Sequence, residues 1–193
     1  GYDGIDGLAL NLMRNGYLPL TMPEVSAERL SGADLVILIA PARSFSAKEC
    51  RELEEFVRGG GVLISMIGAE DAAANHRLLD EFGVSVAVSP VPTCGDAREP
   101  EPMGRFRTLY FDGNLYGVGD YQTGVTFHNG WPVTIDGASG EVLVYGMRDE
   151  PIVVQRVVGQ GSFVLIGDSD FALNKNLEYV GGETFGGKQE NAN

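Results

Sequence analysis

The sequence has little positive charge. It carries 14 lysines and arginines against 27 aspartates and glutamates in 193 residues, a formal net charge of −13. A negative field of that size repels the phosphate backbone of nucleic acids and the anionic headgroups of lipids. We therefore expect no nucleic-acid partner and no direct docking on an anionic membrane surface.

Cysteine and histidine are also scarce, with two of each. Two cysteines do not make a disulfide framework. Cys50 falls on the apolar face of a predicted helix and Cys94 in a predicted loop, so whether they pair is left open. His76 and His128 lie in a predicted helix and a predicted turn, and no Cys-x-x-Cys or His-x-x-x-His spacing occurs. We expect no structural metal site and no cofactor.

Long apolar runs are missing too. No segment approaches the roughly 20 apolar residues of a membrane-spanning helix, and no signal peptide is visible. The sequence starts at Gly1 without a methionine, directly before a predicted helix, and ends at Asn193 without a clear final element. Both ends resemble cuts, which leaves room for a membrane anchor beyond them.

Residues 35–40 form a continuous apolar run of strand length, as is typical of a strand buried on both faces of a parallel sheet, and residues 62–67, apolar except for Ser65, are predicted as the next buried strand. The helix predicted between them begins with a Ser-x-x-Glu capping box, Ser46 with Glu49. A second helix follows residue 67 and leads to a further strand at 84–88. Two strand–helix units in succession predict right-handed crossovers within one sheet.

The flanking segments complete the predicted fold. We expect a first helix at 3–15, a short edge strand at 17–22, and a hairpin of 152–158 with 162–167 that makes the sheet mixed. Residues 89–149 are rich in proline and glycine and then in short strand patterns, which indicates a β-rich insertion.

These features predict a single α/β domain over residues 1–193. Its fold class is a flavodoxin-like three-layer sandwich with a mostly parallel sheet.

The first candidate site is Asp168-Ser169-Asp170, which directly follows a predicted buried strand. In open α/β sheets, ligands bind beyond the carboxyl ends of the strands. Two carboxylates with a hydroxyl between them suit a hard cation such as Ca²⁺ or Mg²⁺. The same aspartates also suit a helix cap or a loop brace, which needs no function. Both interpretations stay open.

A second strand end carries Gly68-Ala69-Glu70. Many α/β hydrolases place a serine nucleophile on such a turn, within Gly-x-Ser-x-Gly. Here no serine or cysteine occupies the turn, which argues against acyl transfer of that type. After the first strand, Arg43 supplies a cation that can bind a carboxylate with two hydrogen bonds. We predict no catalytic residue and a ligand-binding set at these strand ends: Arg43, Ser44, Glu70, Asp168, Ser169 and Asp170.

Two segments also carry a family resemblance. Residues 34–64, with the capping box and Gly59-Gly60-Gly61, and residues 159–171, followed by Asn174 and Asn176, resemble the class I glutamine-amidotransferase-like superfamily. The similarity is to its domain-of-unknown-function branch, found in extracytoplasmic parts of prokaryotic membrane proteins. Auxiliary domains of gliding-type ABC transporters are relatives of that branch. The resemblance covers about residues 3–88 and 150–193.

The resemblance implies an additional first strand, which would lie upstream of Gly1. Amidotransferase members of the superfamily use a cysteine nucleophile with a histidine partner, and neither has a matching position here. The branch is regarded as non-catalytic, in agreement with the missing nucleophile.

We therefore predict a non-catalytic domain that binds a ligand or a protein, displayed outside the membrane by an anchor beyond this segment. A cytoplasmic location is left open. The alternative is a hydrolase that uses Asp168, Asp170 and Glu70, with or without a metal, since paired carboxylates can serve as acid and base. A third hypothesis is an assembly domain that packs against a partner or another copy through an exposed apolar patch.

Overall fold

The structure is a computed structural model. It describes residues 4–89, 127, 130–137, 140–145 and 150–173, and the backbone at 107–108, 179–180 and 183–184. Within these parts of the chain, no helix is long and apolar enough to cross a membrane. Cys94, His128, Asn174, Asn176 and most of the predicted insertion lie outside the described residues.

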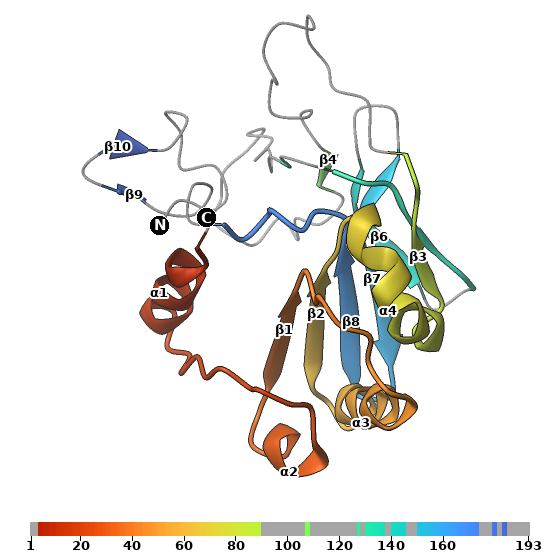
Figure 1. Cartoon of the computed structure of the whole chain (residues 1–193), viewed down its shortest axis with the longest axis horizontal. Helices are drawn as coiled ribbons and strands as arrows, with labels where there is room; N and C mark the ends of the chain where they lie inside the picture. Colours follow the sequence, from red (N-terminus) through yellow and green to blue (C-terminus); the bar gives the residue numbers. More distant parts are fainter. Residues whose placement is uncertain are drawn as a thin grey trace, which may run out of the picture.

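The described residues form helices and short strands in alternation through the first half, then mainly strands (Figure 1). The helices are α1 (Asp6–Arg14), α2 (Ala27–Leu30), α3 (Ala47–Arg58) and α4 (Ala69–Glu81). The strands are β1 (Leu35–Ile39), β2 (Val62–Met66), β3 (Val84–Val86), β4 (Arg107–Thr108), β5 (Val133–Ile135), β6 (Gly140–Tyr145), β7 (Pro151–Val158), β8 (Gly161–Ile166), β9 (Tyr179–Val180) and β10 (Glu183–Thr184).

Six strands form one mixed sheet in the order β1-β2-β8-β7-β6-β4. β1 pairs with β2, and β2 with β8, in parallel. The remaining three pairings, β8–β7, β7–β6 and β6–β4, are antiparallel. The predicted mixed α/β sheet and the predicted hairpin of β7 with β8 are confirmed. The finer assignment to a flavodoxin-like three-layer sandwich stays a prediction.

The capping box begins α3 as predicted. Ser46 Oγ accepts the Glu49 N–H, and the Glu49 carboxylate accepts the Ser46 N–H at 2.9 Å. The two hydrogen bonds satisfy backbone donors that the first helical turn leaves free. Cys50, Leu53 and Val57 then recur at helical spacing and are buried against the sheet. The sequence thus determines both where α3 begins and which face it buries.

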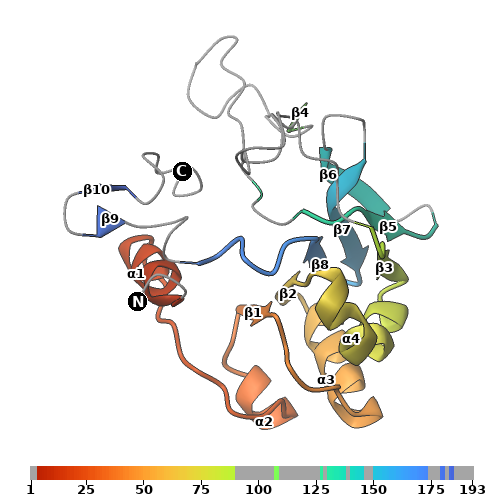
Figure 2. The ribbon, with the colours of Figure 1, turned by 45° about the horizontal axis from the view of Figure 1, so that its top comes forward.

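The main core fills the face of the sheet on which α3 and α4 lie (Figures 1 and 2). At its centre the rings of Phe82, at the end of α4, and Phe163, on β8, stack with centroids 4.2 Å apart and an interplanar angle of 6°. Leu78 and Leu79 of α4 join this core, as the helical spacing predicts. A second cluster, which includes Met66, Ile166 and Phe127, lies on the other face of the sheet.

Two expectations about strands are wrong. After α4 the chain does not return to the main sheet, because β3 pairs antiparallel with β5 in a separate two-stranded sheet. The position next to β2 is taken by β8, whose longer apolar run buries side chains on both faces. Residues 17–22 form no strand, and Leu18 and Leu20 are 79% and 81% exposed.

Leu53 tests whether α3 is held by burial. Its side chain is 0% exposed, so we expect Leu53→Ala to lower the free energy of unfolding by about 2–5 kcal/mol, through lost transfer energy and a residual cavity. Urea denaturation followed by circular dichroism measures this change. Leu18→Ala, at a side chain that is 79% exposed, should stay within about 0.5 kcal/mol of the parent. Equal losses in the two variants would contradict the packing described.

Candidate functional site

The candidate site lies where three parallel strands end. β1, β2 and β8 run side by side in the same direction, so their carboxyl ends meet at one edge of the sheet (Figure 1). The loops that follow are residues 40–46, residues 67–68 leading into α4, and residues 167–170. We call this edge the crevice. In open α/β sheets, ligands bind in this position.

Glu70 and Ser169 connect two sides of the crevice. Ser169 Oγ donates a hydrogen bond of 3.0 Å to Glu70 Oε1, although the two residues are 99 positions apart in the sequence. Ser169 is 8% exposed, whereas Glu70 is exposed. The Glu70 carboxylate folds back over Gly68, where any Cβ would collide with it. The glycine therefore leaves room for the Glu70 carboxylate at this edge of the sheet, and the Ser169 hydroxyl holds it there.

Asp168 is part of the buried framework of the site. Its side chain is 0% exposed, and Oδ1 accepts the Asp170 N–H at 2.8 Å. This turn, in which a side chain mimics a backbone carbonyl, fixes the residues that follow β8. Asp168 therefore braces the loop that presents Ser169, and Asp170 remains half-buried beside it.

A third carboxylate, Asp71, lies next to Glu70 in the first turn of α4. Burial raises the pKa of Asp71, a hydrogen bond with the Gly68 backbone opposes the rise, and repulsion from Glu70 and Asp170 adds to it. Its Oδ2 is buried and has no hydrogen-bond partner. The crevice is thus a region of concentrated negative charge, in which a positive group would lower the electrostatic energy.

Arg43, the predicted cation of the site, is bound to another part of the chain. Its two terminal nitrogens contact the two carboxylate oxygens of Glu49 at 3.2 and 2.6 Å, and one of them also donates to the Ser44 carbonyl at 3.2 Å. The guanidinium carbon lies 5.3 Å from the centre of the Phe45 ring. The Arg43 hydrogen bond is the largest influence that lowers the pKa of Glu49, from 4.5 to about 2.

Asn75 is a part of the site that the sequence analysis missed. It is 1% exposed, and its Nδ2 donates to the carbonyls of Pro41, at 3.1 Å, and Asp71, at 2.8 Å. It ties α4 to the loop after β1, at the edge of the sheet where the candidate site lies. Its spacing of three and four residues from Leu78 and Leu79 places it on the buried helix face, which is the signal that could have identified it.

The chain is strained where β1 enters the crevice. Ala40 has a φ of 39°, in the left-handed region that residues other than glycine seldom adopt. Its N–H donates to the Met66 carbonyl at 2.9 Å, which holds this conformation against the end of β2. Such strain costs free energy and persists where surrounding contacts enforce it, commonly at functional sites.

Other chemistry-bearing residues do not join the crevice. The exposed His76 hydrogen-bonds the Ala73 carbonyl on α4, and Cys50 is a free, buried thiol whose pKa is raised by burial. In the parts of the chain that the structure describes, no three His, Cys, Asp or Glu side chains are grouped to hold a metal ion. Of the predicted set, the structure brings Glu70, Ser169, Asp168 and Asp170 together and gives Arg43 a partner in Glu49.

Comparison with known proteins identifies a family over nearly the whole chain. Residues 3–186 match the family described as Domain of unknown function (DUF4350). No curated protein matches the chain in sequence.

Solved structures share the fold. The chain is similar to the mmIFT52 N-terminal domain, at 19% identity and a TM-score of 0.74, over 89% of this chain and 82% of that one. A cytoplasmic protein from Salmonella typhimurium LT2 is 14% identical, with a TM-score of 0.60 over 86% and 76% of the two chains. A second cytoplasmic protein, from Salmonella typhimurium, is 15% identical, with a TM-score of 0.57 over 84% and 74%. At these identities the similarity shows the fold alone.

The Arg43–Glu49 pair gives a pH prediction. Because folding depresses the pKa of Glu49, the ionised carboxylate stabilises the folded state. This contribution to the free energy of unfolding is fully present above about pH 4.5 and is lost as the pH falls through about 2. We expect Glu49→Gln to lower the free energy of unfolding by about 1 kcal/mol at pH 7, as for loss of a helix cap, and the deficit to shrink from pH 4.5 to 2.

Urea denaturation at a series of pH values measures the deficit. Glu54→Gln is the matched control on the same helix, because Glu54 pairs with Arg58 on the exposed side of α3. A deficit for Glu49→Gln that did not change with pH would show that the carboxylate charge is unimportant.

Proposed function

The chain belongs to the DUF4350 family of domains of unknown function, and from its crevice we propose a non-catalytic domain that binds a cationic or hydrogen-bond-donating group of a ligand or protein. The observation that carries the proposal is the exposed Glu70 carboxylate, fixed by Ser169 at 3.0 Å over Gly68. It offers a positioned acceptor at the place where α/β sheets bind ligands. The turn after β2, Gly68-Ala69-Glu70, holds no serine or cysteine nucleophile.

Electrostatics favour a positively charged ligand. Glu70 and Asp170 repel the charge of Asp71, so an incoming ammonium group would relieve this repulsion. A ligand carboxylate would be repelled by the same groups, and it would compete with Glu49 for Arg43. The proposal therefore rests on the acidic residues and leaves Arg43 as a structural partner of Glu49.

The hydrolase alternative receives no support from this geometry. Asp168 is fully buried, and its Oδ1 holds the Asp170 N–H. A buried brace is poorly placed to exchange protons with a substrate. Membership of the amidotransferase-like superfamily, a three-layer sandwich and an extracytoplasmic, membrane-anchored location stay predictions from the sequence.

The absence of catalysis is tested with the purified domain and a panel of chromogenic ester, amide and glycoside substrates. We expect no turnover above the uncatalysed rate, and no difference between the parent and Ser169→Ala, the variant that removes the crevice hydroxyl. Hydrolysis that Ser169→Ala or Asp170→Asn abolishes would overturn the proposal in favour of the hydrolase.

Binding is tested by titrating ¹⁵N-labelled domain with ethylammonium chloride at constant ionic strength. We expect saturable changes in the amide signals of Gly68, Ser169 and Asp170, and a loss of affinity of roughly tenfold in Glu70→Gln, as for a lost charge-assisted hydrogen bond. Glu81→Gln, at the other end of α4, is the control and should bind as the parent does. Responses of the same amides to sodium acetate instead would contradict the acidic character of the site.

A further inference from the structure

The outer edge of β1 is open. β1 ends the strand order of the main sheet, so among the described residues it has a neighbouring strand, β2, on one side only (Figure 1). At one end of β1 the Asp34 carbonyl accepts the Val62 N–H at 3.0 Å. At the other end the Ala40 N–H donates to the Met66 carbonyl at 2.9 Å. Because backbone groups alternate in direction along a strand, even-numbered positions bond to β2. The odd-numbered positions therefore direct their N–H and carbonyl groups to the open side: Leu35, Ile37 and Ile39.

The strand itself has none of the features that protect a sheet edge. Natural edge strands carry lysine, proline, a bulge or an inward-pointing charge, which discourage pairing with another chain. The five residues of β1 are all leucine, isoleucine or valine, and they pair with β2 without a register shift. Ile37 and Ile39 pack against the second cluster and remain half-buried. A regular, apolar, open edge of this kind is a template for a further strand.

Exposed apolar side chains are concentrated on the same side of the molecule. The described residues have eight large hydrophobic side chains that are exposed, and six of these lie between Ile5 and Leu20. Figures 1 and 2 place α1 and the residues that follow it beyond β1, on the outer side of the sheet. Concentrations of exposed apolar surface mark sites of protein association. The open strand and the apolar side chains thus point to one interaction surface.

The edge of β1 is complementary to itself. When two β1 strands pair antiparallel about a two-fold axis at Ile37, this residue faces its own counterpart, and Leu35 faces Ile39 of the second copy. Every position with outward backbone groups then meets another such position, so the N–H and carbonyl groups of both strands find partners. A second copy therefore brings a strand of the same length, with the same open positions and the same apolar face.

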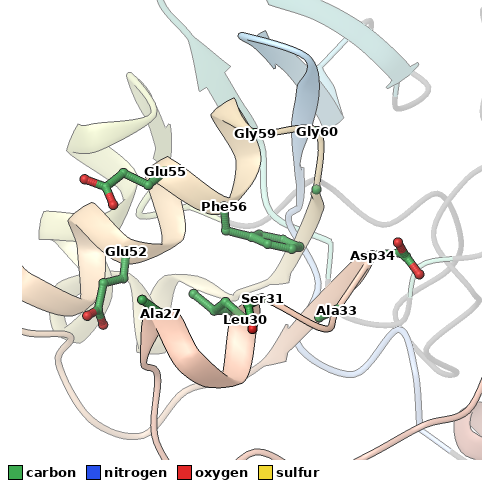
Figure 3. Close-up of a pocket in the computed structure, with 11 residues that line it drawn as sticks. Ala27, Leu30, Ser31, Ala33, Asp34, Glu52, Glu55, Phe56, Gly59 and Gly60 are labelled. Carbon is green, nitrogen blue, oxygen red and sulfur yellow. The ribbon is translucent and has the colours of Figure 1, made fainter.

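Charge at the strand end does not oppose this register. Asp34 directly precedes β1 and lines a pocket between α2 and the end of α3. Figure 3 shows its carboxylate pointing away from α2 and α3. In the antiparallel register Asp34 lies opposite Ala40 of the second copy, at the far end of the strand. Like charges directly opposite each other, which would destabilise the pairing, are thereby avoided.

We propose that the outer edge of β1 binds a second copy of the chain, through antiparallel pairing of the two β1 strands about Ile37. The two main sheets continue into each other, and both copies use the same surface, as in other two-fold symmetric dimers. Each copy carries a net charge of −13, so long-range repulsion opposes the association. Salt screens this repulsion and should strengthen the dimer.

Sedimentation velocity over a series of protein and salt concentrations measures the association. We expect a reversible monomer–dimer equilibrium that shifts toward dimer as the salt concentration rises. A domain that stays monomeric at every concentration, or a dimer that salt dissociates, would overturn the proposal.

Amide hydrogen exchange, followed by NMR, locates the contact. In dilute solution the amides of Val36 and Leu38 should be protected by β2, whereas those of Leu35, Ile37 and Ile39 should exchange rapidly. At concentrations that favour the dimer, all five should be protected. Rapid exchange of the odd-numbered amides in the dimer would overturn the proposal. Protection of these amides in the monomer would do the same, because the chain would then cover its own edge.

Two charge variants test the two-fold axis. Ile37→Lys and Ile37→Glu each place like charges opposite each other, so each should weaken self-association by roughly tenfold or more. An equimolar mixture of the two should associate again, because the introduced charges are then of opposite sign. A loss without recovery in the mixture would refute the register, and the exchange pattern of the unsubstituted domain decides the proposal even if the variants unfold.

Val157→Lys is the control for added charge. Val157 is 59% exposed on β7, three strands from β1, and the register across the sheet places it on the same face as Ile37. This variant should associate as the parent does. An equal loss in Val157→Lys and Ile37→Lys would show that net charge, and not the β1 edge, controls the association.

Discussion

The parallel pairing of β8 with β2 is the constraint on which the rest of the site depends. It aligns Met66 with Ile166, so the residues after both strands emerge at the same level. Only because of this register does Ser169 reach Glu70, 99 positions earlier in the sequence. The β7–β8 hairpin supplies β8 from the far end of the chain, and the Ile67 N–H, which donates to the Ile166 carbonyl at 3.0 Å, extends the pairing into the crevice.

The loops at this edge are held by polar contacts that cross between elements. Asn75 fixes the loop after β1 to α4, and Asp168 fixes the turn after β8. Arg43 is bound by the same Glu49 that closes the capping box of α3, so one carboxylate organises both a helix start and its preceding loop. The side chains of Asn75, Asp168, Arg43 and Glu49 thus hold the loops in position. Glu70, Asp71 and Asp170 are then the charged groups of the crevice that are left to meet a ligand.

Negative charge has a different setting at each end of the sheet. At the crevice, burial raises the pKa of Asp71, and Glu70 and Asp170 lie close enough to raise it further. At the opposite end, Asp34, Glu52 and Glu55 are among the residues that line a pocket beside the end of α3. The net charge of −13 adds a long-range negative field around the whole domain.

The sequence by itself determined the local structure: the apolar runs of β1 and β2, the capping box of α3, the buried face of α4 and the β7–β8 hairpin, because each depends on neighbours within a few residues. It also placed Glu70, Ser169 and Asp168 at the ends of strands, since strand ends are visible in the apolar pattern. Only the tertiary structure decided which strand lies beside β2, that β3 leaves the sheet, and that Arg43 pairs with Glu49. Those outcomes depend on competition between distant segments for the same place in the sheet, and on side-chain directions that no local pattern encodes.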